Sequence, residues 1–538
     1  MQHWWRGAVI YQIYPRSFMD SNGDGIGDLP GIVEKLEHVA ALGADAIWIS
    51  PFFPSPMADF GYDIADYRGV DPMFGTLEDF DRLLHKAHGL GIKVMIDQVL
   101  SHCSDQHAWF QESRLSRDNT RADWFVWADP KPDGSPPNNW MSIFGGVAWH
   151  WEPRREQYYL HNFLAAQPDL NFHNPQVQEA VLDNVRFWLD RGVDGLRLDA
   201  INFCFHDRLL RDNPPKPKEL RVGRGFSADN PYAYQYHWYN NTRPEMLPFL
   251  GRLRALMDCY PDVAALGEIS SEDSLATTAE YTAPGRLHMG YSFELLVEDF
   301  SAGYIRATVE RLEAGMQGGW PCWAVSNHDV VRALTRWGGE GDDDFAAQLV
   351  ALVCCLRGSV CLYQGEELGL AEADVPYERL QDPYGKAFWP NFKGRDGCRT
   401  PMPWSDAAHG GFSGHEPWLP VPAEHVARNV QAQQADPHSV LQRVRAFLHW
   451  RRRQPALVEG GIEFLDAPEP VLAFVRTHPA GDRLVAFNLS AQAVDWPLPD
   501  GLAPGLIELP GGVAAKLHGA TLQLPARGIA LAALEPRA

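Results

Sequence analysis

Eight short apolar runs that alternate with helical patterns constrain the fold of this chain more than any other feature. Each run has the length of one strand, and a loop and a helix-like segment follow it. Eight strands that alternate with helices favour a closed parallel barrel over an open sheet. The runs span residues 9–14, 46–50, 93–99, 195–200, 263–268, 288–292, 323–325 and 360–363.

Two regions interrupt this alternation. One is rich in Trp, Pro and Asn and leaves the barrel after the third strand, where barrel active sites form. In the other, the pattern changes to period two, which is typical of an antiparallel sheet. We therefore predict an α/β fold, a (β/α)8 TIM barrel with a loop domain inserted after strand 3 and a C-terminal antiparallel β domain. The predicted boundaries are 1–102 and 175–460 for the two parts of the barrel, 103–174 for inserted domain B and 461–538 for the β domain.

The charge balance excludes several classes of partner. The chain has 47 basic and 69 acidic residues, which gives a net charge of −22. Such an acid excess repels phosphate backbones and anionic headgroups, so we expect neither nucleic acid nor a membrane as a partner. No apolar run is long enough to span a membrane, no signal core follows Met1, and the eight cysteines form no disulfide framework. We expect a cytoplasmic monomer or homodimer that acts on a neutral small molecule without an organic cofactor.

Acidic side chains recur at the ends of the predicted strands. Alternation along residues 195–200 places Arg197 and Asp199 on the face opposite to the leucines, toward the barrel axis. The next strand ends in Glu268. Neighbouring parallel strands lie ~4.8 Å apart, so these two carboxyls are expected near the ~5–5.5 Å separation of retaining glycosidases.

Two further strand ends add to this group. The seventh strand leads into His328 and Asp329, and the third strand carries Asp97 and leads to His102. Four acids and two histidines at the strand ends of one barrel are more than packing explains. Together they predict an active site at the carboxyl ends of the strands.

Several motifs in this arrangement resemble a known family. Residues 97–102, 195–200, 267–269 and 327–329 resemble the four signature regions of the α-amylase superfamily, glycoside hydrolase family 13. Residues 167–171 resemble a fifth region, in the form typical of the oligo-1,6-glucosidase and α-glucosidase branch. The resemblance runs in order over essentially the whole chain.

The resemblance implies a role for each matching residue. It implies Asp199 as nucleophile, Glu268 as general acid/base and Asp329 as stabiliser of the transition state, while Asp97, His102, Arg197 and His328 bind glucose. On physical grounds, Arg197 should hold the Asp199 carboxylate ionised. The neighbouring acids should raise the pKa of Glu268 enough for it to protonate a leaving oxygen.

Two distant segments predict a closed end to the site. In exo-acting glucosidases that this sequence resembles, the residues matching Asp63 and Arg399 pair and grip the terminal glucose, while the residue matching Tyr62 stacks on it. Such a pair presents fixed donors and acceptors and also walls off one end of a cleft. Phe163 and Phe144 are candidate sugar-contacting aromatics, with a place in the core as the alternative for each.

A loop near the N-terminus follows the logic of a calcium site. Its ligands at positions 1, 3, 5, 7 and 9 would be Asp20, Asn22, Asp24, the Ile26 carbonyl and Asp28. The loop departs from that logic at position 12, where Gly31 replaces the bidentate Glu. Similar glucosidases hold a structural ion in the matching loop, so we expect structural Ca²⁺ or Mg²⁺.

The predicted function is that of a retaining exo-acting α-glucosidase. It would cleave terminal α-1,4-linked glucose from maltose and maltooligosaccharides through a covalent β-glucosyl-Asp199 intermediate and pass glucose to water or to sugar and alcohol acceptors. Ala200 favours α-1,4 bonds, because α-1,6 enzymes of the family tend to carry Val there. The irregular loop at 212–230 is expected to influence water exclusion and acceptor packing. Alternatives are an oligo-1,6-glucosidase, a sucrose- or trehalose-type glucosyl isomerase, and a non-catalytic barrel.

Overall fold

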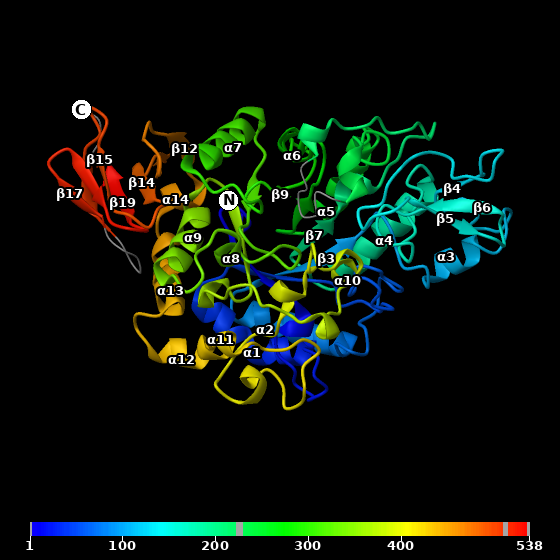
Figure 1. Cartoon of the computed structure of the whole chain (residues 1–538), viewed down its shortest axis with the longest axis horizontal. Helices are drawn as coiled ribbons and strands as arrows, with labels where there is room; N and C mark the ends of the chain where they lie inside the picture. The colour runs from blue at the N-terminus through cyan, green and yellow to red at the C-terminus, as the bar shows by residue number, and fades with distance from the viewer. Residues whose placement is uncertain (1–2, 222–229, 509–514, 535–538) are drawn as a thin grey trace.

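The predicted strands close into a parallel barrel in a computed structural model that describes residues 3–221, 230–508 and 515–534 (Figure 1). The order around the barrel follows the chain, and the last strand pairs with the first. The prediction of a TIM barrel is therefore confirmed. The strands are β1 Val9–Ile13, β2 Ala46–Ile49, β3 Lys93–Val99, β7 Gly195–Asp199, β8 Ala264–Glu268, β9 Met289–Tyr291, β10 Pro321–Trp323 and β11 Ser359–Tyr363.

The seventh strand differs most from its prediction. It lies two residues earlier than the predicted 323–325, because Cys322 and Trp323 pair with β11 and the chain then leaves the ladder. Ala324 and Val325 are buried but belong to no strand. The sequence prediction assigned these two residues to a strand because they are apolar, but a buried loop also requires apolar residues.

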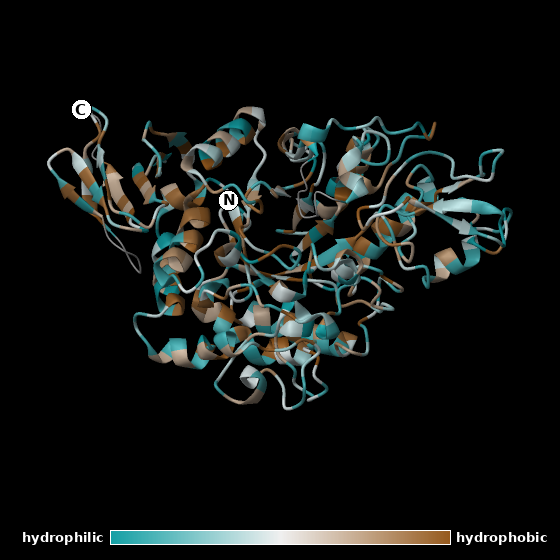
Figure 2. Ribbon diagram, viewed as in Figure 1, coloured by the Kyte–Doolittle hydropathy of each residue, from teal (hydrophilic) through white to brown (hydrophobic). Residues whose placement is uncertain are grey.

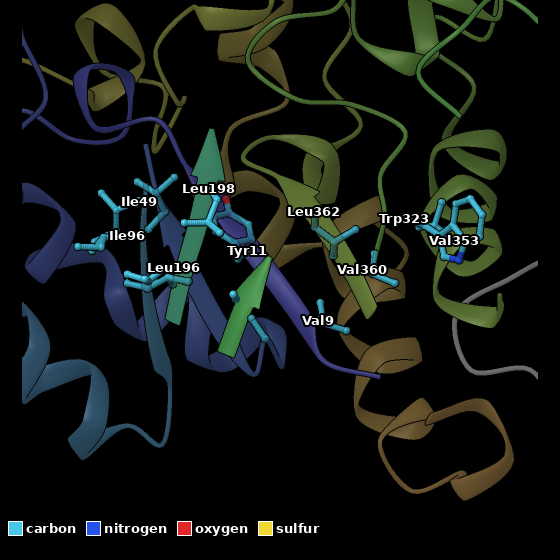
Figure 3. Close-up of a cluster of buried hydrophobic side chains, with 14 of the residues drawn as sticks. Val9, Tyr11, Ile49, Ile96, Leu196, Leu198, Trp323, Val353, Val360 and Leu362 are labelled. Carbon is cyan, nitrogen blue, oxygen red and sulfur yellow. The ribbon is translucent and has the colours of Figure 1, made fainter. Parts of the chain in front are cut away.

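Successive residues of the barrel strands face two different hydrophobic cores. Val9 and Tyr11 of β1 pack in the core between barrel and helices, whereas Ile10 packs with Trp48 and other inward-facing residues. Figure 3 shows Leu198 of β7 in the outer of these cores. Because both faces of the sheet are covered, its strands are apolar runs, as expected for a parallel sheet.

Helices cover the outside of the barrel, and Figure 2 shows both hydrophobic and hydrophilic residues on them. In α4 the Asn174 side chain accepts a hydrogen bond from the Gln176 N–H and Pro175 occupies the first turn, which fixes where the helix begins. Helix α13 (Val440–Arg451) packs against both α9 (Asp343–Cys355) and α1 (Leu29–Leu42). The longer helices are α1 Leu29–Leu42, α2 Leu77–Gly89, α4 Pro175–Asp190, α5 Met246–Met257, α6 Ser274–Tyr281, α7 Ala302–Gly315, α9 Asp343–Cys355 and α13 Val440–Arg451. The shorter ones are α3 Ala108–Ser113, α8 Ala333–Arg336, α10 Pro383–Phe388, α11 Ala423–Ala427, α12 Val430–Ala435 and α14 Pro455–Glu459.

The two interruptions lie at opposite ends of the molecule's long axis (Figure 1). The segment after β3 forms a small sheet of β4 Trp127–Ala128, β6 Gln157–Leu160 and β5 Trp149–Glu152. The C-terminal region forms two antiparallel sheets, as predicted, although 509–514 and 535–538 of the predicted domain lie outside the described residues. Its strands are β12 Gly461–Phe464, β13 Val471–Thr477, β14 Arg483–Asn488, β15 Val494–Pro497, β16 Pro504–Ile507, β17 Lys516–His518, β18 Thr521–Leu524 and β19 Ile529–Leu534. No helix in the described part of the chain is long and apolar enough to cross a membrane.

Arg476 of β13 ties the C-terminal domain to the barrel. Its side chain is fully buried and donates to the carbonyl oxygens of Cys355 at 2.7 Å and Leu356 at 2.9 Å, where α9 ends. It also donates to Leu457 at 3.1 Å and Gly460 at 2.8 Å, just before β12. One guanidinium of the C-terminal domain thus satisfies four carbonyls of residues that precede the domain boundary.

Replacement of this side chain is predicted to loosen the boundary. Arg476→Leu leaves buried carbonyls without donors, so we expect the free energy of unfolding to fall by at least about 3 kcal/mol. Thermal and denaturant unfolding measure this loss. Arg453→Leu is the matched control, because Arg453 is exposed. Equal stability of the two variants would contradict the role given to Arg476.

Candidate active site

Neighbouring parallel strands bring the predicted charged residues to one edge of the barrel. In the pairing of β3 with β7, Asp97 lies opposite Arg197. The register of β7 with β8 brings Glu268 to the level of Asp199. Because the carboxyl ends of parallel strands meet at the same edge, these four side chains converge.

The Arg197 guanidinium connects three carboxylates. Its Nη1 donates to Asp97 Oδ1 at 3.0 Å and to Asp199 Oδ1 at 2.8 Å, and its Nη2 contacts Glu268 Oε1. The guanidinium carbon lies 4.7 Å from the centroid of the Trp48 ring. Asp199 and Glu268 therefore both contact the same guanidinium group.

The turn after β7 holds the second oxygen of Glu268. Ala200 adopts a left-handed conformation with φ 40° and precedes a 3₁₀ helix at Ile201–Phe203. This turn directs the Ala200 N–H to Glu268 Oε2 at 2.9 Å. Both carboxylate oxygens of Glu268 are thus held before any ligand arrives.

The loop after β10 supplies the third acid. Asp329 Oδ1 accepts from Arg399 Nη2 at 2.8 Å and from Arg395 Nη1 at 3.2 Å. The neighbouring His328 ring stacks on Tyr62, with the ring centroids 5.4 Å apart, and its Nε2 lies 2.7 Å from the Tyr62 hydroxyl. His328 therefore holds the Tyr62 ring in position, and both residues were predicted to bind the sugar.

These side chains surround a pocket of about 130 Å³. Of the predicted residues, Tyr62, His102, Phe163, Asp199, Glu268 and Asp329 line it, and Phe144 does too. This position favours the sugar-contacting alternative for both phenylalanines. The remaining predicted residues are buried without lining the pocket, namely Asp63, Asp97, Arg197, His328 and Arg399.

The three acids differ in their affinity for protons. Burial raises the pKa of Glu268 to about 8 and that of Asp199 to about 7, although Arg197 lowers both. Burial would also raise the pKa of Asp329, but His328, Arg395 and Arg399 outweigh it and hold that pKa well below its usual range. The predicted rise for Glu268 is confirmed, with burial as its main cause and the neighbouring acids adding to it.

One electrostatic expectation was too simple. Arg197 was expected to hold the Asp199 carboxylate ionised, yet the pKa of Asp199 is raised to about 7. The desolvation of a fully buried carboxyl exceeds the attraction of a guanidinium that Asp199 shares with Asp97 and Glu268.

The predicted pairing of Asp63 with Arg399 is wrong. Asp63 lies inside its own loop and accepts from the Ser55 hydroxyl at 2.9 Å and the Ala58 N–H at 2.8 Å. Arg399 instead donates to the His328 carbonyl at 2.7 Å and to Asp329. Asp63 therefore shapes the loop rather than the wall of the pocket.

The pair that borders the pocket consists of Asp59 and Arg395. Arg395 Nη2 donates to Asp59 Oδ1 at 2.8 Å and to Asp382 Oδ1 at 2.8 Å, while Nη1 reaches Asp329. Asp59 Oδ2 also accepts from Gln167 Nε2 at 3.2 Å. Each member of this pair lies four residues before the residue predicted, so the motifs located the correct loops and the wrong side chains.

Other lining residues carry weaker signals in the sequence. Gln167 lies in the fifth motif, and its Nε2 lies 3.3 Å from His102 Nε2. Tyr384 packs edge-on against Phe144 at 5.4 Å, and nothing in the local sequence distinguishes it from a core residue. The lining residues that were not predicted as site residues are Asp59, Ile143, Gln167, Ala200, Phe203, Ser270, Phe293, Val330, Tyr384 and Arg395. Residues 222–229, part of the irregular loop at 212–230, lie outside the described residues.

The predicted metal loop forms a chain of local hydrogen bonds. Asp20 accepts from the Gly25 N–H at 2.8 Å and from the Ser413 hydroxyl at 2.6 Å, and these bonds and others outweigh burial to lower its pKa. Asp28 caps α1 by accepting from the Gly31 N–H at 2.6 Å. Within residues 3–221, 230–508 and 515–534, no group of three or more His, Cys, Asp or Glu side chains is arranged to hold a metal ion. The loop keeps oxygen donors suited to a hard cation, so the ion stays a prediction.

Comparisons with known proteins agree with this geometry. Residues 12–460 match the model of the alpha amylase catalytic domain, and residues 462–531 match that of the maltogenic amylase C-terminal domain. A probable alpha-glucosidase of Rhizobium meliloti is 58% identical over 92% of this chain and 91% of its own length. An oligo-1,6-glucosidase of Heyndrickxia coagulans is 37% identical over 93% and 94%. The solved structure of an alpha-glucosyl transfer enzyme, XgtA, is 69% identical, with a TM-score of 0.98 over 99% of this chain and 100% of that one. The chain belongs to the α-amylase family of glycoside hydrolases, family 13.

Proposed function

We propose that this protein is a retaining exo-acting α-glucosidase that also transfers glucose to sugar or alcohol acceptors. The observation that carries the proposal is the single Arg197 fork that contacts both Asp199 and Glu268. Two carboxyls that contact one guanidinium favour the short separation of retaining glycosidases over the wider one that leaves an inverting enzyme room for a water. Retention through a covalent intermediate follows.

The mechanism assigns one task to each acid. Asp199 attacks the anomeric carbon while protonated Glu268 gives its proton to the leaving oxygen, and the glycosidic bond breaks. Glu268, now ionised, then takes a proton from water or an acceptor hydroxyl, whose oxygen displaces Asp199. Asp329 stays ionised beside Arg395 and Arg399 and stabilises the positive charge that develops on the sugar.

The wall around Arg395 supports exo action. Arg395 is almost fully buried and joins Asp59, Asp382 and Asp329, so one end of the pocket is closed by paired charges. A chain-internal glucose would need that end open. A terminal glucose instead finds fixed donors and acceptors for its hydroxyls.

Ala200 supports a preference for α-1,4 bonds, since it lines the pocket with a small side chain.

Oligo-1,6-glucosidase activity and glucosyl isomerisation use the same acids and remain the alternatives. Incubation with maltose, isomaltose, sucrose and trehalose, with and without an alcohol acceptor, separates them by product. The proposal predicts glucose from maltose and an alkyl α-glucoside with the alcohol. An isomerised disaccharide from sucrose as main product would favour the isomerase. Comparable activity in Asp199→Ala would contradict the mechanism.

The pKa values predict a bell-shaped dependence of kcat/KM on pH. Asp199 must be ionised to attack, so activity should rise with pH through its pKa of about 7. Glu268 must be protonated, so activity should fall as pH passes its pKa of about 8. Glu268→Gln should abolish maltose cleavage but retain glucosylation by p-nitrophenyl α-glucoside, whose leaving group needs no proton. If kcat/KM of this variant still falls at alkaline pH, a group other than Glu268 is the general acid.

Two aspartates four residues apart test the corrected wall. Asp59→Asn weakens the partner of Arg395, so we expect kcat/KM for maltose to fall at least about tenfold, the loss of one charge-assisted hydrogen bond. Asp63→Asn should mainly lower the melting temperature, because Asp63 binds only its own loop. Kinetics and thermal unfolding of both variants decide between them. A fall in kcat/KM in Asp63→Asn, with only the melting temperature lowered in Asp59→Asn, would show that Asp63 is the substrate-binding residue.

For the loop at Asp20–Asp28, we propose that its oxygen atoms bind a structural Ca²⁺ or Mg²⁺ ion. An ion at 100 times its Kd should stabilise the fold by about 2.7 kcal/mol. We expect Ca²⁺ to raise the melting temperature and a chelator to lower it, with both effects lost in Asp24→Ala. Asp24 is exposed, so this variant leaves the core intact. No difference between the two conditions in the unaltered protein would exclude the ion.

A further inference from the structure

Gln12 of β1 is a buried polar residue to which the mechanism assigns no task. Ile10, two residues earlier, faces the inner core, so alternation along the strand places Gln12 inside the barrel as well. Its side chain is fully buried, and its carbonyl oxygen has no hydrogen-bond partner among the described residues. A buried amide is costly unless its hydrogen bonds are used, so the bonds of the amide nitrogen indicate what this residue does.

The amide nitrogen has two partners, and one of them belongs to the active site. Gln12 Nε2 donates to Ser50 Oγ at 3.3 Å and lies 2.7 Å from His328 Nδ1. An amide nitrogen has donors and no acceptor, so His328 Nδ1 must accept this hydrogen bond with its lone pair. His328 Nδ1 therefore carries no proton.

The His328 ring is neutral, which leaves its one proton on the other nitrogen. Burial lowers the pKa of His328 to about 3. Of the charged groups that act on the ring, Asp329 opposes this effect and three arginines add to it, namely Arg399, Arg197 and Arg395. A neutral imidazole carries one proton, so His328 is protonated at Nε2.

Two side chains that line the pocket accept from this Nε2–H. Asp329 Oδ2 lies 3.2 Å from His328 Nε2, and an ionised carboxylate can only accept. The Tyr62 hydroxyl lies 2.7 Å from the same nitrogen and donates its own hydrogen to Asp97 Oδ2 at 3.1 Å, so it also accepts from Nε2. The hydrogen bonds are thus directed from Gln12 through His328 to two groups at the pocket.

Stacking alone does not set this direction. The His328 ring stacks on the rings of Tyr62 and Tyr14, with ring centroids 5.4 and 5.7 Å away and interplanar angles of 8° and 22°. These contacts fix the plane of the imidazole but do not distinguish its two nitrogens. At Nδ1, Gln12 is the one hydrogen-bond partner among the described residues, and it makes that distinction.

From these contacts we propose that Gln12 is a positioning residue for the glycosidase reaction. It sets the orientation of His328 and its tautomer, protonated at Nε2, and through this ring it holds the Tyr62 hydroxyl and the Asp329 carboxylate at the pocket. Gln12 does not line the pocket, so it acts on the sugar only through His328. The inference rests on the proposed glucosidase function and adds to it a residue from a strand that supplies none of the acids.

The tautomer can be measured without any activity. In protein labelled with ¹⁵N-histidine, NMR separates ring nitrogens that carry a proton from those that do not, and the signals that disappear in His328→Gln belong to His328. We expect a protonated Nε2 and an unprotonated Nδ1. Gln12→Met should shift the Nδ1 signal, because it removes the donor. A proton on Nδ1 of the unaltered protein, or His328 signals that Gln12→Met leaves unchanged, would overturn the proposal.

Kinetics of a matched pair of variants show what this bond contributes to catalysis. Gln12→Met keeps the length of the side chain and removes the donor. Gln348→Met is the control, because Gln348 of α9 is also fully buried, has an unpaired carbonyl oxygen and donates to the Asn488 carbonyl at 2.8 Å. With p-nitrophenyl α-glucoside, we expect kcat of Gln12→Met to fall about tenfold with KM nearly unchanged, since Asp329 acts on the charge of the transition state. Gln348→Met should lower only the melting temperature, and an equal fall in kcat in both variants would contradict the assignment.

A double-mutant cycle separates positioning from a general loss of packing. His328→Gln places an amide next to Gln12, and an amide has no tautomers to select. In that background Gln12→Met should lower kcat/KM by less than about twofold, whereas a packing defect would cause the same fall as in the unaltered protein. An equal fall in both backgrounds overturns the proposal. If the unaltered protein hydrolyses neither p-nitrophenyl α-glucoside nor maltose, the glucosidase function fails instead, and the tautomer measured by NMR still stands.

Discussion

The buried guanidinium of Arg197 is the interaction on which the site depends. A charge in the barrel interior is costly unless it is paired, and this one contacts Asp97, Asp199 and Glu268 together. Its presence brings two carboxyls into one small volume, where repulsion would otherwise separate them. Its single charge cannot neutralise all three acids, so burial keeps the pKa values of Asp199 and Glu268 raised.

The rest of the pocket follows from a second group of charges. Arg395 and Arg399 lower the pKa of Asp329, and Asp59 and Asp382 fix Arg395 in turn. The surroundings thus give the acids different pKa values. Glu268 shares the single guanidinium of Arg197 with two other acids and favours a proton, whereas Asp329 contacts the guanidinium groups of both Arg395 and Arg399 and stays ionised. This difference lets one barrel provide an acid and a permanently ionised stabiliser at the same pH.

Much of the fold could be predicted because barrel strands buried on both faces are continuous apolar runs, and because alternation on β7 separates Arg197 and Asp199 from the leucines. The seventh strand was misplaced, because Ala324 and Val325 are buried without pairing. The wall of the pocket was also misplaced, because Asp59 and Asp63 share one loop and Arg395 and Arg399 share another. Which member of each pair turns inward depends on backbone geometry and on Asp382, which no local pattern reveals.

The stereochemistry of the first product tests the central claim, that Arg197 holds the two carboxyls close enough for a covalent intermediate on Asp199. Proton NMR can follow maltose hydrolysis from the first seconds, before the released glucose mutarotates. The geometry of β7 and β8 predicts that α-glucose appears first and β-glucose only later. Initial release of β-glucose would show that water attacks directly, and it would contradict this account.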